Sequence, residues 1–460
     1  MTSSMRITFS ITPIVEVNGL LSNLILGVGN FVVGSDELPR LHRIDKNNFA
    51  PRVGLAYRLT ENGKTTLRGG VGVFYDNGVF QDRFITARTN APFAITAIDN
   101  DPAPFPQGDS PAVTFTRLLG SGQATSAASI DVNYRTPYAL QYNLNAQREL
   151  ALSTLAEIAY VGRRGLNASR PVNINQVVAA NSPAATVLGL PVGSRLFDNP
   201  TVPAAARFAN DVIQQQFNGQ STYHALQLRI ERRFAKGLSF LTGYTWSKSI
   251  DDVSGIGTGA DDRAQDSNNL RAQRAVSNFD ITHRFIFSAT YDLPFGKGRS
   301  FFSQASPVVS ALISDWQVNS ITTWQSGLPF TVTVGSFDPV AQISNRRPDV
   351  ISDPRDNVPV GLSFNPAAFV APPAGRLGNA GRNTLRGDRY YNTDISLIRQ
   401  FPLPLLGDAG ALNFRAEFFN VFNHPNFSLP VSSLSSGAFG RFVNNATAPR
   451  IVQFALKATF

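Results

Sequence analysis

Four histidines are the side chains in this sequence best suited to catalysis or to binding a transition metal. His42, His224, His283 and His424 are widely separated, and none belongs to an HExxH motif or a similar ligand spacing. The chain contains no cysteine, which excludes disulfides, thiolate zinc sites and cysteine nucleophiles. We therefore interpret the histidines as polar residues of strands and loops, and we predict neither a metal cofactor nor an enzyme.

Acidic side chains gather in one short stretch, where carboxylate oxygens could bind Ca²⁺. The spacing differs from that of an EF-hand loop. A solvated loop is the favoured interpretation, and a bound calcium ion is the weaker alternative. The cluster comprises Asp251, Asp252, Asp261, Asp262 and Asp266.

Two glycine-containing stretches resemble nucleotide-binding motifs only in part. The Gly-Lys-Thr sequence at 63–65 ends like a phosphate-binding loop, but Arg58 stands where that motif requires its first glycine. The glycines within 69–72 lack the third glycine of a dinucleotide fingerprint. We expect a hairpin turn at the first stretch, close packing on a strand at the second, and no nucleotide cofactor.

The elements that position these residues are predicted from composition. Of 460 residues, 43% are hydrophobic and only 16% are charged, which excludes a disordered or acidic solvating chain. The 36 glycines and 29 prolines favour one large β architecture over long helices. A formal net charge of +9 would permit contact with nucleic acid, but the basic residues are scattered, so we predict no nucleic-acid partner.

Hydrophobic alternation predicts β-strands with two different faces. Polar residues interrupt the longest apolar run, 20–33, so no transmembrane helix is expected. The expected strands are 5–17, 48–60, 64–76, 136–150, 153–165, 221–234, 238–252, 283–295, 315–330, 390–403, 412–423 and 450–460.

The alternation also assigns side chains to opposite faces of the predicted sheet. In the last strand, Val452, Phe454, Leu456 and Phe460 share the apolar face. An Arg or Lys facing lipid at the bilayer midplane costs about 2 to 4 kcal/mol, so the polar row of a membrane barrel is expected to face its lumen. The polar residues expected there are Gln141, Asn143, Asn145, Arg229, Glu231, Arg233, Arg415, Glu417 and Lys457.

Connection lengths favour a membrane barrel over a soluble sandwich, which would show the same alternation. Compact soluble domains rarely contain several structureless loops longer than about 12 to 15 residues. Outer-membrane barrels have short periplasmic turns and long extracellular loops, and the linkers here alternate in that way. The short turns include 61–63, 151–152 and 235–237, and the long loops are 18–47, 77–135, 166–220, 253–282, 331–389 and 424–449.

Aromatic residues fall toward the ends of the expected strands. Tyrosine and tryptophan rings with one polar edge favour the headgroup level of a bilayer, although core packing at sheet ends would also explain individual rings. The aromatic residues expected at the interface are Tyr57, Tyr75, Tyr160, Tyr244, Trp246 and Tyr291.

Seven stretches together carry a resemblance to a known family. They are NNFAPRVGLAYRLTENGKTTLRGGVGVFYD (47–76), TPYALQYNLNAQREL (136–150), GYTWSKSIDD (243–252), SNFDITHRF (277–285), GRNTLRGD (381–388), FRAEFFNVFNHPNF (414–427) and the terminal Phe460. With these motifs the chain resembles the TonB-dependent outer-membrane receptors of the Oar-like, acidobacterial type.

This resemblance implies a barrel of about 22 strands closed by an N-terminal plug and energised through TonB. No signal peptide, TonB box or plug is visible in 1–460, so we expect the C-terminal part of such a barrel. The antiparallel barrel part would lie in the outer membrane of a Gram-negative-type bacterium, with lipid around it. Its polar lumen residues would hold the plug or guide solutes.

The resemblance further implies that the alternating apolar residues ending at Phe460 are recognised by the barrel-assembly machinery. The parent protein would import a large solute such as a siderophore, an oligosaccharide or a peptide, with 77–135, 166–220 and 331–389 as contact loops. A small closed barrel, pairing 5–17 with 450–460, is a structural alternative. A passive porin or adhesin without a plug, or a soluble carbohydrate-binding β protein, is a functional alternative.

Overall fold

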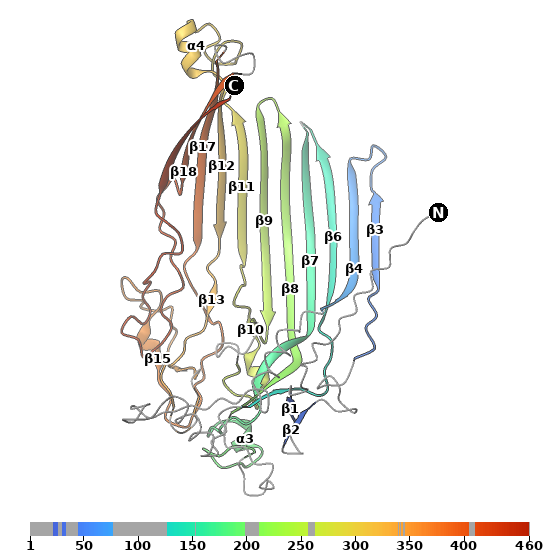
Figure 1. Ribbon diagram of the computed structural model, residues 1–460, viewed down its shortest axis with the longest axis vertical. Coiled ribbons are helices and arrows are strands. Elements are labelled where there is room, and N and C mark those ends of the chain that lie inside the picture. The colour runs from blue at the N-terminus through green and yellow to red at the C-terminus, as the bar shows by residue number, and fades with distance from the viewer. Residues whose placement is uncertain are drawn as a thin grey trace, which may run out of the picture.

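One large antiparallel sheet dominates the computed structural model (Figure 1). The structure describes residues 22–25, 30–33, 45–76, 127–151, 153–197, 211–255, 263–338, 340, 342–343, 346–403 and 410–459. Across the sheet, the strands follow the order β19 (Ile451–Thr459), β18 (Ala411–Phe419), β17 (Tyr390–Pro402), β12 (Trp316–Gln325), β11 (His283–Asp292), β9 (Leu238–Asp251), β8 (Val212–Ala235), β7 (Thr154–Asn173), β6 (Tyr138–Leu150), β4 (Thr65–Tyr75) and β3 (Arg52–Arg58).

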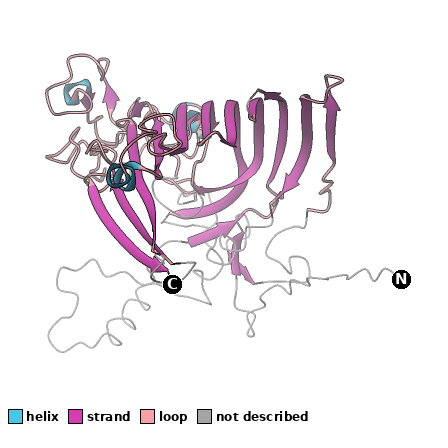
Figure 2. Ribbon diagram, turned by 90° about the horizontal axis from the view of Figure 1, so that it is seen from above, coloured by secondary structure: helices cyan, strands magenta, loops and turns pink. Residues whose placement is uncertain are grey.

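The strands confirm the predicted all-β class. Each of these strands coincides with one of the expected segments, while the remaining segment, 5–17, lies outside the described residues. In the part of the chain that the structure describes, β3 and β19 are the two edges of the sheet. Figure 2 shows the strands following an arc, and the expected closure through 5–17 falls on residues that are not described.

The short connections form the tight turns that the sequence predicts. In the β3–β4 hairpin, the Leu59 amide donates to the Thr65 carbonyl at 2.9 Å, and Gly63 adopts a φ of 69°. Lys236 and Gly237 between β8 and β9 both have positive φ, which suits the right-handed twist of a two-residue hairpin. The short turns therefore lie together at one end of the sheet, opposite the long connections (Figure 1).

Strands β7 and β8 are longer than expected, with 20 and 24 residues. Their pairing shifts register between Gly165 and Ala168 and again before Ser169. A bulge changes the phase of the alternation, so the extension cannot be followed from the expected segments. Beyond the bulge, β5 (Ala127–Ile130) pairs in parallel with β8.

The expected strand 315–330 is in fact two strands. β12 ends at Gln325, and β13 (Pro329–Phe330) pairs separately with β16 (Leu385–Arg386). Between them, a Cβ on Gly327 would lie 1.9 Å from the Gly387 carbonyl oxygen, so the two backbones approach closely. Strand β18 also ends earlier than expected, at Phe419 instead of residue 423.

Short elements complete the long-loop end of the sheet. A small apolar core there contains Phe330, Val332, Phe364, Ala368, Phe369 and Leu385. None of the helices in the described ranges is long and apolar enough to cross a bilayer. The short elements of this end are β1 (Ser22–Ile25), β2 (Asn30–Val33), α3 (Pro183–Thr186), η3 (Leu270–Gln273), β10 (Ala275–Val276), β14 (Asp349–Val350), η4 (Pro366–Ala368) and β15 (Phe369–Val370). One more helix, α4 (Pro307–Ile313), lies at the opposite, short-turn end (Figure 1).

Candidate solute-binding surface

The register of the strands sorts side chains onto two faces, which we call the polar face and the apolar face. On the polar face, Gln147, Glu157 and Arg229 stand side by side on β6, β7 and β8. Gln147 donates to a Glu157 carboxylate oxygen at 2.9 Å, and Arg229 pairs with Glu231 at 2.6 Å. Charged and amide side chains thus satisfy one another across three strands.

The polar residues expected to face the lumen lie on these strands. Gln141, Asn143 and Asn145 follow β6, and Asn145 lies beside the Glu157 carboxylate. Arg415 and Glu417 on β18 form an ion pair at 3.4 Å, with Lys457 on the adjacent β19. Arg233 lies at the short-turn end of β8, where its backbone amide donates to the Ser153 carbonyl.

The apolar face carries the row of alternating residues at the end of the chain. Val452, Phe454 and Leu456 stand opposite Phe418, Ala416 and Phe414. All three side chains on β19 are exposed in the isolated chain. Phe460, the last residue of the expected row, lies outside the described residues.

The aromatic residues expected at the bilayer interface also lie on the apolar face. Tyr160, Leu226, Trp246 and His283 form one row across four strands. Tyr244 follows beside it, and Tyr75 ends β4 next to Tyr138, with ring centroids 5.5 Å apart. At the opposite end of the sheet, Tyr57 and Tyr291 lie near the short turns.

Three histidines contact tyrosines at the long-loop end of the apolar face. The Tyr160 hydroxyl lies 2.7 Å from His224 Nδ1, and the Tyr244 hydroxyl lies 2.8 Å from His283 Nδ1. His424 packs edge-on against the Tyr391 ring. His42 lies outside the described residues.

The acidic cluster is divided among separate partners. Asp251 pairs with Arg382, and Asp252 pairs with Arg170. Asp266 accepts hydrogen bonds from the Ser182 hydroxyl and the Asn268 amide. Asp261 and Asp262 are not described, and the described residues contain no group of three potential metal ligands.

Buried ion pairs join connections that are distant in sequence to the long-loop end of the sheet. Asp280, which is 1% exposed, pairs with Arg386 and also accepts from the Ser249 backbone amide at 2.6 Å. Nearby, Asn383 donates through its side-chain amide to Asn278 at 2.6 Å. These contacts join the motif 277–285 to the motif 381–388.

A second set of cations is buried in the same loop assembly. Arg346 pairs with Asp338, and Arg347 donates to the Ala380 carbonyl at 3.1 Å. Burial and the neighbouring charge of Arg382 lower the pKa of Arg347 to about 10. The loops at this end are therefore held by specific polar contacts.

The polar face contains a hollow of about 390 Å³ beside these loops. Gln141, Arg163, Tyr223 and Ser249 line it from four adjacent strands in one register row. Phe279 closes one side, next to Asp280. The hollow combines an amide, a guanidinium and aromatic rings.

The sequence analysis named Gln141 and Asn143 at this hollow but missed its other lining residues. Alternation nevertheless places Arg163 and Tyr223 on the polar face.

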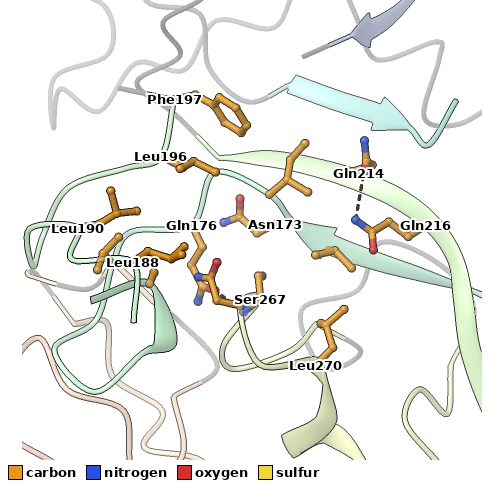
Figure 3. A pocket seen from close by; sticks show the side chains of 15 residues that line it. Asn173, Gln176, Leu188, Leu190, Leu196, Phe197, Gln214, Gln216, Ser267 and Leu270 are labelled. Carbon is orange, nitrogen blue, oxygen red and sulfur yellow. Dashed lines mark hydrogen bonds between the residues drawn. The ribbon is translucent and has the colours of Figure 1, made fainter. Parts of the chain in front are cut away.

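A second hollow, of about 320 Å³, lies in the connection that contains α3 (Figure 3). Its lining is leucine-rich and includes Leu188, Leu190, Leu196 and Phe197. Uncharged amides, among them Gln176 and Gln214, point into it. Among the described residues that line this hollow, none is charged, whereas Arg163 lines the first hollow.

The sequence matches one family model along most of its length: the outer membrane beta barrel domain, over residues 10–453. The chain belongs to this family. An outer-membrane barrel presents an apolar band to lipid, so the apolar face is the lipid-facing side of the sheet. The protein is therefore an outer-membrane protein.

Solved structures similar to this outer-membrane barrel have low sequence identity. They include the outer membrane transporter YddB from Escherichia coli (9% identity, TM-score 0.46, covering 89% of this chain and 40% of that one). The siderophore receptor PirA from Acinetobacter baumannii has 11% identity and a TM-score of 0.45, covering 90% and 41%. The chain thus spans about 40% of the length of these structures. No curated protein sequence matches it.

Proposed function

We propose that this chain forms barrel wall and extracellular loops of a TonB-dependent receptor that imports a large solute. The Oar-like sequence motifs support the family subtype, and the match to the outer membrane beta barrel domain supports a contribution to a barrel wall. The chain would be its C-terminal part, and the plug and the TonB complex would be partners of the full receptor. No catalytic step is part of this proposal.

The observation that carries the proposal is the polar row Gln141–Arg163–Tyr223–Ser249. It lies on the polar face of the sheet and ends at the anchored loops. Hydrogen-bonding groups and aromatic rings at the mouth of a barrel suit a polar solute that must be held and then released inward. Asn145, Arg229 and Glu231 continue the polar face toward the short turns, where they would contact the plug.

The solute would be a siderophore, an oligosaccharide or a peptide. Loops 166–220 and 331–389 supply the anchored surfaces at the mouth, whereas 77–126 lies outside the described residues. A calcium ion bound by the acidic cluster of Asp251, Asp252, Asp261, Asp262 and Asp266 stays the weaker alternative, and Asp261 and Asp262 lie outside the described residues.

Uptake measurements in the native host test this function. The gene is deleted and restored, and uptake of each solute class is measured with the TonB complex present and absent. We expect restored uptake only with TonB. Arg163→Gln should lower it, and Arg164→Gln is the matched control because the adjacent residue faces lipid. Uptake that persists without TonB, together with steady conductance of the purified chain in a planar bilayer, would instead support a passive porin.

A further inference from the structure

We propose that the connection between β11 and β12, with α4 at its centre, is an interfacial anchor that inserts into the periplasmic leaflet of the outer membrane. This connection, 293–315, lies at the short-turn end of the sheet (Figure 1). It is longer than the other turns at that end. Among the described residues, it is also the turn at that end that contains a helix. Its partner would be a phospholipid surface.

The last turn of α4 is fixed to the lipid-facing side of the barrel. The Trp316 indole and the Arg399 guanidinium both donate to the Leu312 carbonyl, at 2.9 and 2.6 Å. Trp316 and Arg399 face each other across β12 and β17, and Trp316 also packs edge-on against Phe414 of the apolar face. The helix is thus held at the rim of the surface that contacts lipid.

Arg399 is suited to this position because its guanidinium contacts two backbone carbonyls and two aromatic rings. The side chain is buried, lies 4.3 Å from the centre of the Phe401 ring and 5.5 Å from that of Trp316, and also donates to the Ala311 carbonyl. Carbonyl oxygens at a helix C-terminus carry partial negative charge and stabilise a cation there. These carbonyl and ring contacts of the guanidinium set the position of α4 at the rim of the sheet.

Several apolar side chains of the connection are largely exposed in the described structure. Val308 is 72% exposed and Leu312 is 66% exposed, and their i, i+4 spacing places them on one face of α4. Phe302, just before the helix, is 65% exposed. Such a cluster continues the apolar band of the barrel beyond the strand ends, at the depth where amphipathic helices enter the headgroup boundary.

The polar groups of the connection are also suited to the headgroup boundary of a bilayer. Ser306 caps the start of α4 by accepting from the Val309 amide. Lys297 supplies a cation for lipid phosphates, and Arg299 pairs with Asp315 at 3.4 Å. Apolar side chains at the centre of the connection and charged groups at its ends are the pattern of an interfacial segment rather than of a spanning one.

Site-directed spin labelling of the full chain tests the anchor, and the absence of native cysteine makes each label unique. Val308→Cys is labelled, and the protein is reconstituted into phosphatidylethanolamine–phosphatidylglycerol vesicles. Val360→Cys, at a 105% exposed loop residue at the opposite end, is the control. We expect the label at 308 to be several-fold more accessible to oxygen, relative to a water-soluble nickel chelate, than the label at 360.

Equal accessibility ratios at the two positions would overturn the proposal. A label at 308 that is shielded from both reagents and shows dipolar broadening would instead identify a second copy as the occupant, and would also overturn it. Heat-modifiable migration of each labelled protein shows that the barrel has assembled. The measurement involves neither solute nor TonB, so its outcome is independent of the proposed transport function.

Discussion

Asp280 and Arg386 form an ion pair although 106 residues separate them in the chain. Through this pair, the connection that leads into β11 is joined to the one that leads into β17. Asp280 also accepts from the Ser249 backbone amide of β9, so both connections are fixed to the long-loop end of the sheet. The long-loop end is therefore a structured cap rather than a set of independent loops.

Loss of this pair should loosen the cap. Arg386→Gln leaves the buried Asp280 carboxylate without its cation, and we expect a loss of about 3 kcal/mol in the free energy of unfolding. Arg355→Gln, which removes an exposed partner of Asp353, is the control and should leave the free energy of unfolding almost unchanged. Denaturant titration in lipid, with limited proteolysis of 331–389, measures both. The double variant Asp280→Asn/Arg386→Gln should be less damaging than Arg386→Gln alone, and equal damage would contradict the assignment.

Backbone contact at Gly327 should make it intolerant of any side chain. Gly327→Ala would place a methyl group against the Gly387 carbonyl and force the two connections apart. Gly437→Ala is the control, because nothing lies within 4 Å of its added Cβ. We expect faster proteolysis of the cap for Gly327→Ala only, while the strands still assemble. Identical protease patterns for the two variants would show that the close approach is unimportant.

Adjacent residues of β19 should respond oppositely to a positive charge. Phe454→Arg places the charge on the lipid-facing side, where a midplane arginine costs about 2 to 4 kcal/mol. Gln453→Arg places it on the polar face opposite Glu417, where it can be hydrated or paired. Unfolding free energies in vesicles compare the two. A larger loss for Gln453→Arg would reverse the assignment of the faces.

The contact between Tyr244 and His283 should contribute about 1 kcal/mol to stability. Tyr244→Phe removes the hydroxyl while keeping the ring in place. A double-mutant cycle with His283→Phe separates this hydrogen bond from ring packing. We expect the two losses to be less than additive, and full additivity would mean that the hydroxyl and the ring do not interact.

The strands were predictable because alternation is a local signal. Twofold periodicity identified β6, β9, β17 and β19, and it also separated the two faces. The extensions of β7 and β8 were missed because the bulges near Gly165 and Ala168 change the phase of that period.

The cap was not predictable in the same way. Its ion pairs connect residues with no periodic relation, such as Asp251 and Arg382, which are 131 positions apart. The sequence identified 277–285 and 381–388 as separate motifs but carried no signal that they meet. The split of 315–330 at Gly327 likewise depends on a distant segment, because the backbone of Gly387 passes there.

The apolar core of the cap, around Phe364 and Phe369, has a thermodynamic consequence. Their rings pack edge-on, with centroids 5.6 Å apart. Ordering a loop costs conformational entropy, and that cost has already been met during folding. A solute of the proposed receptor would therefore meet a preorganised entrance, and its binding energy would remain available for discrimination among competitors.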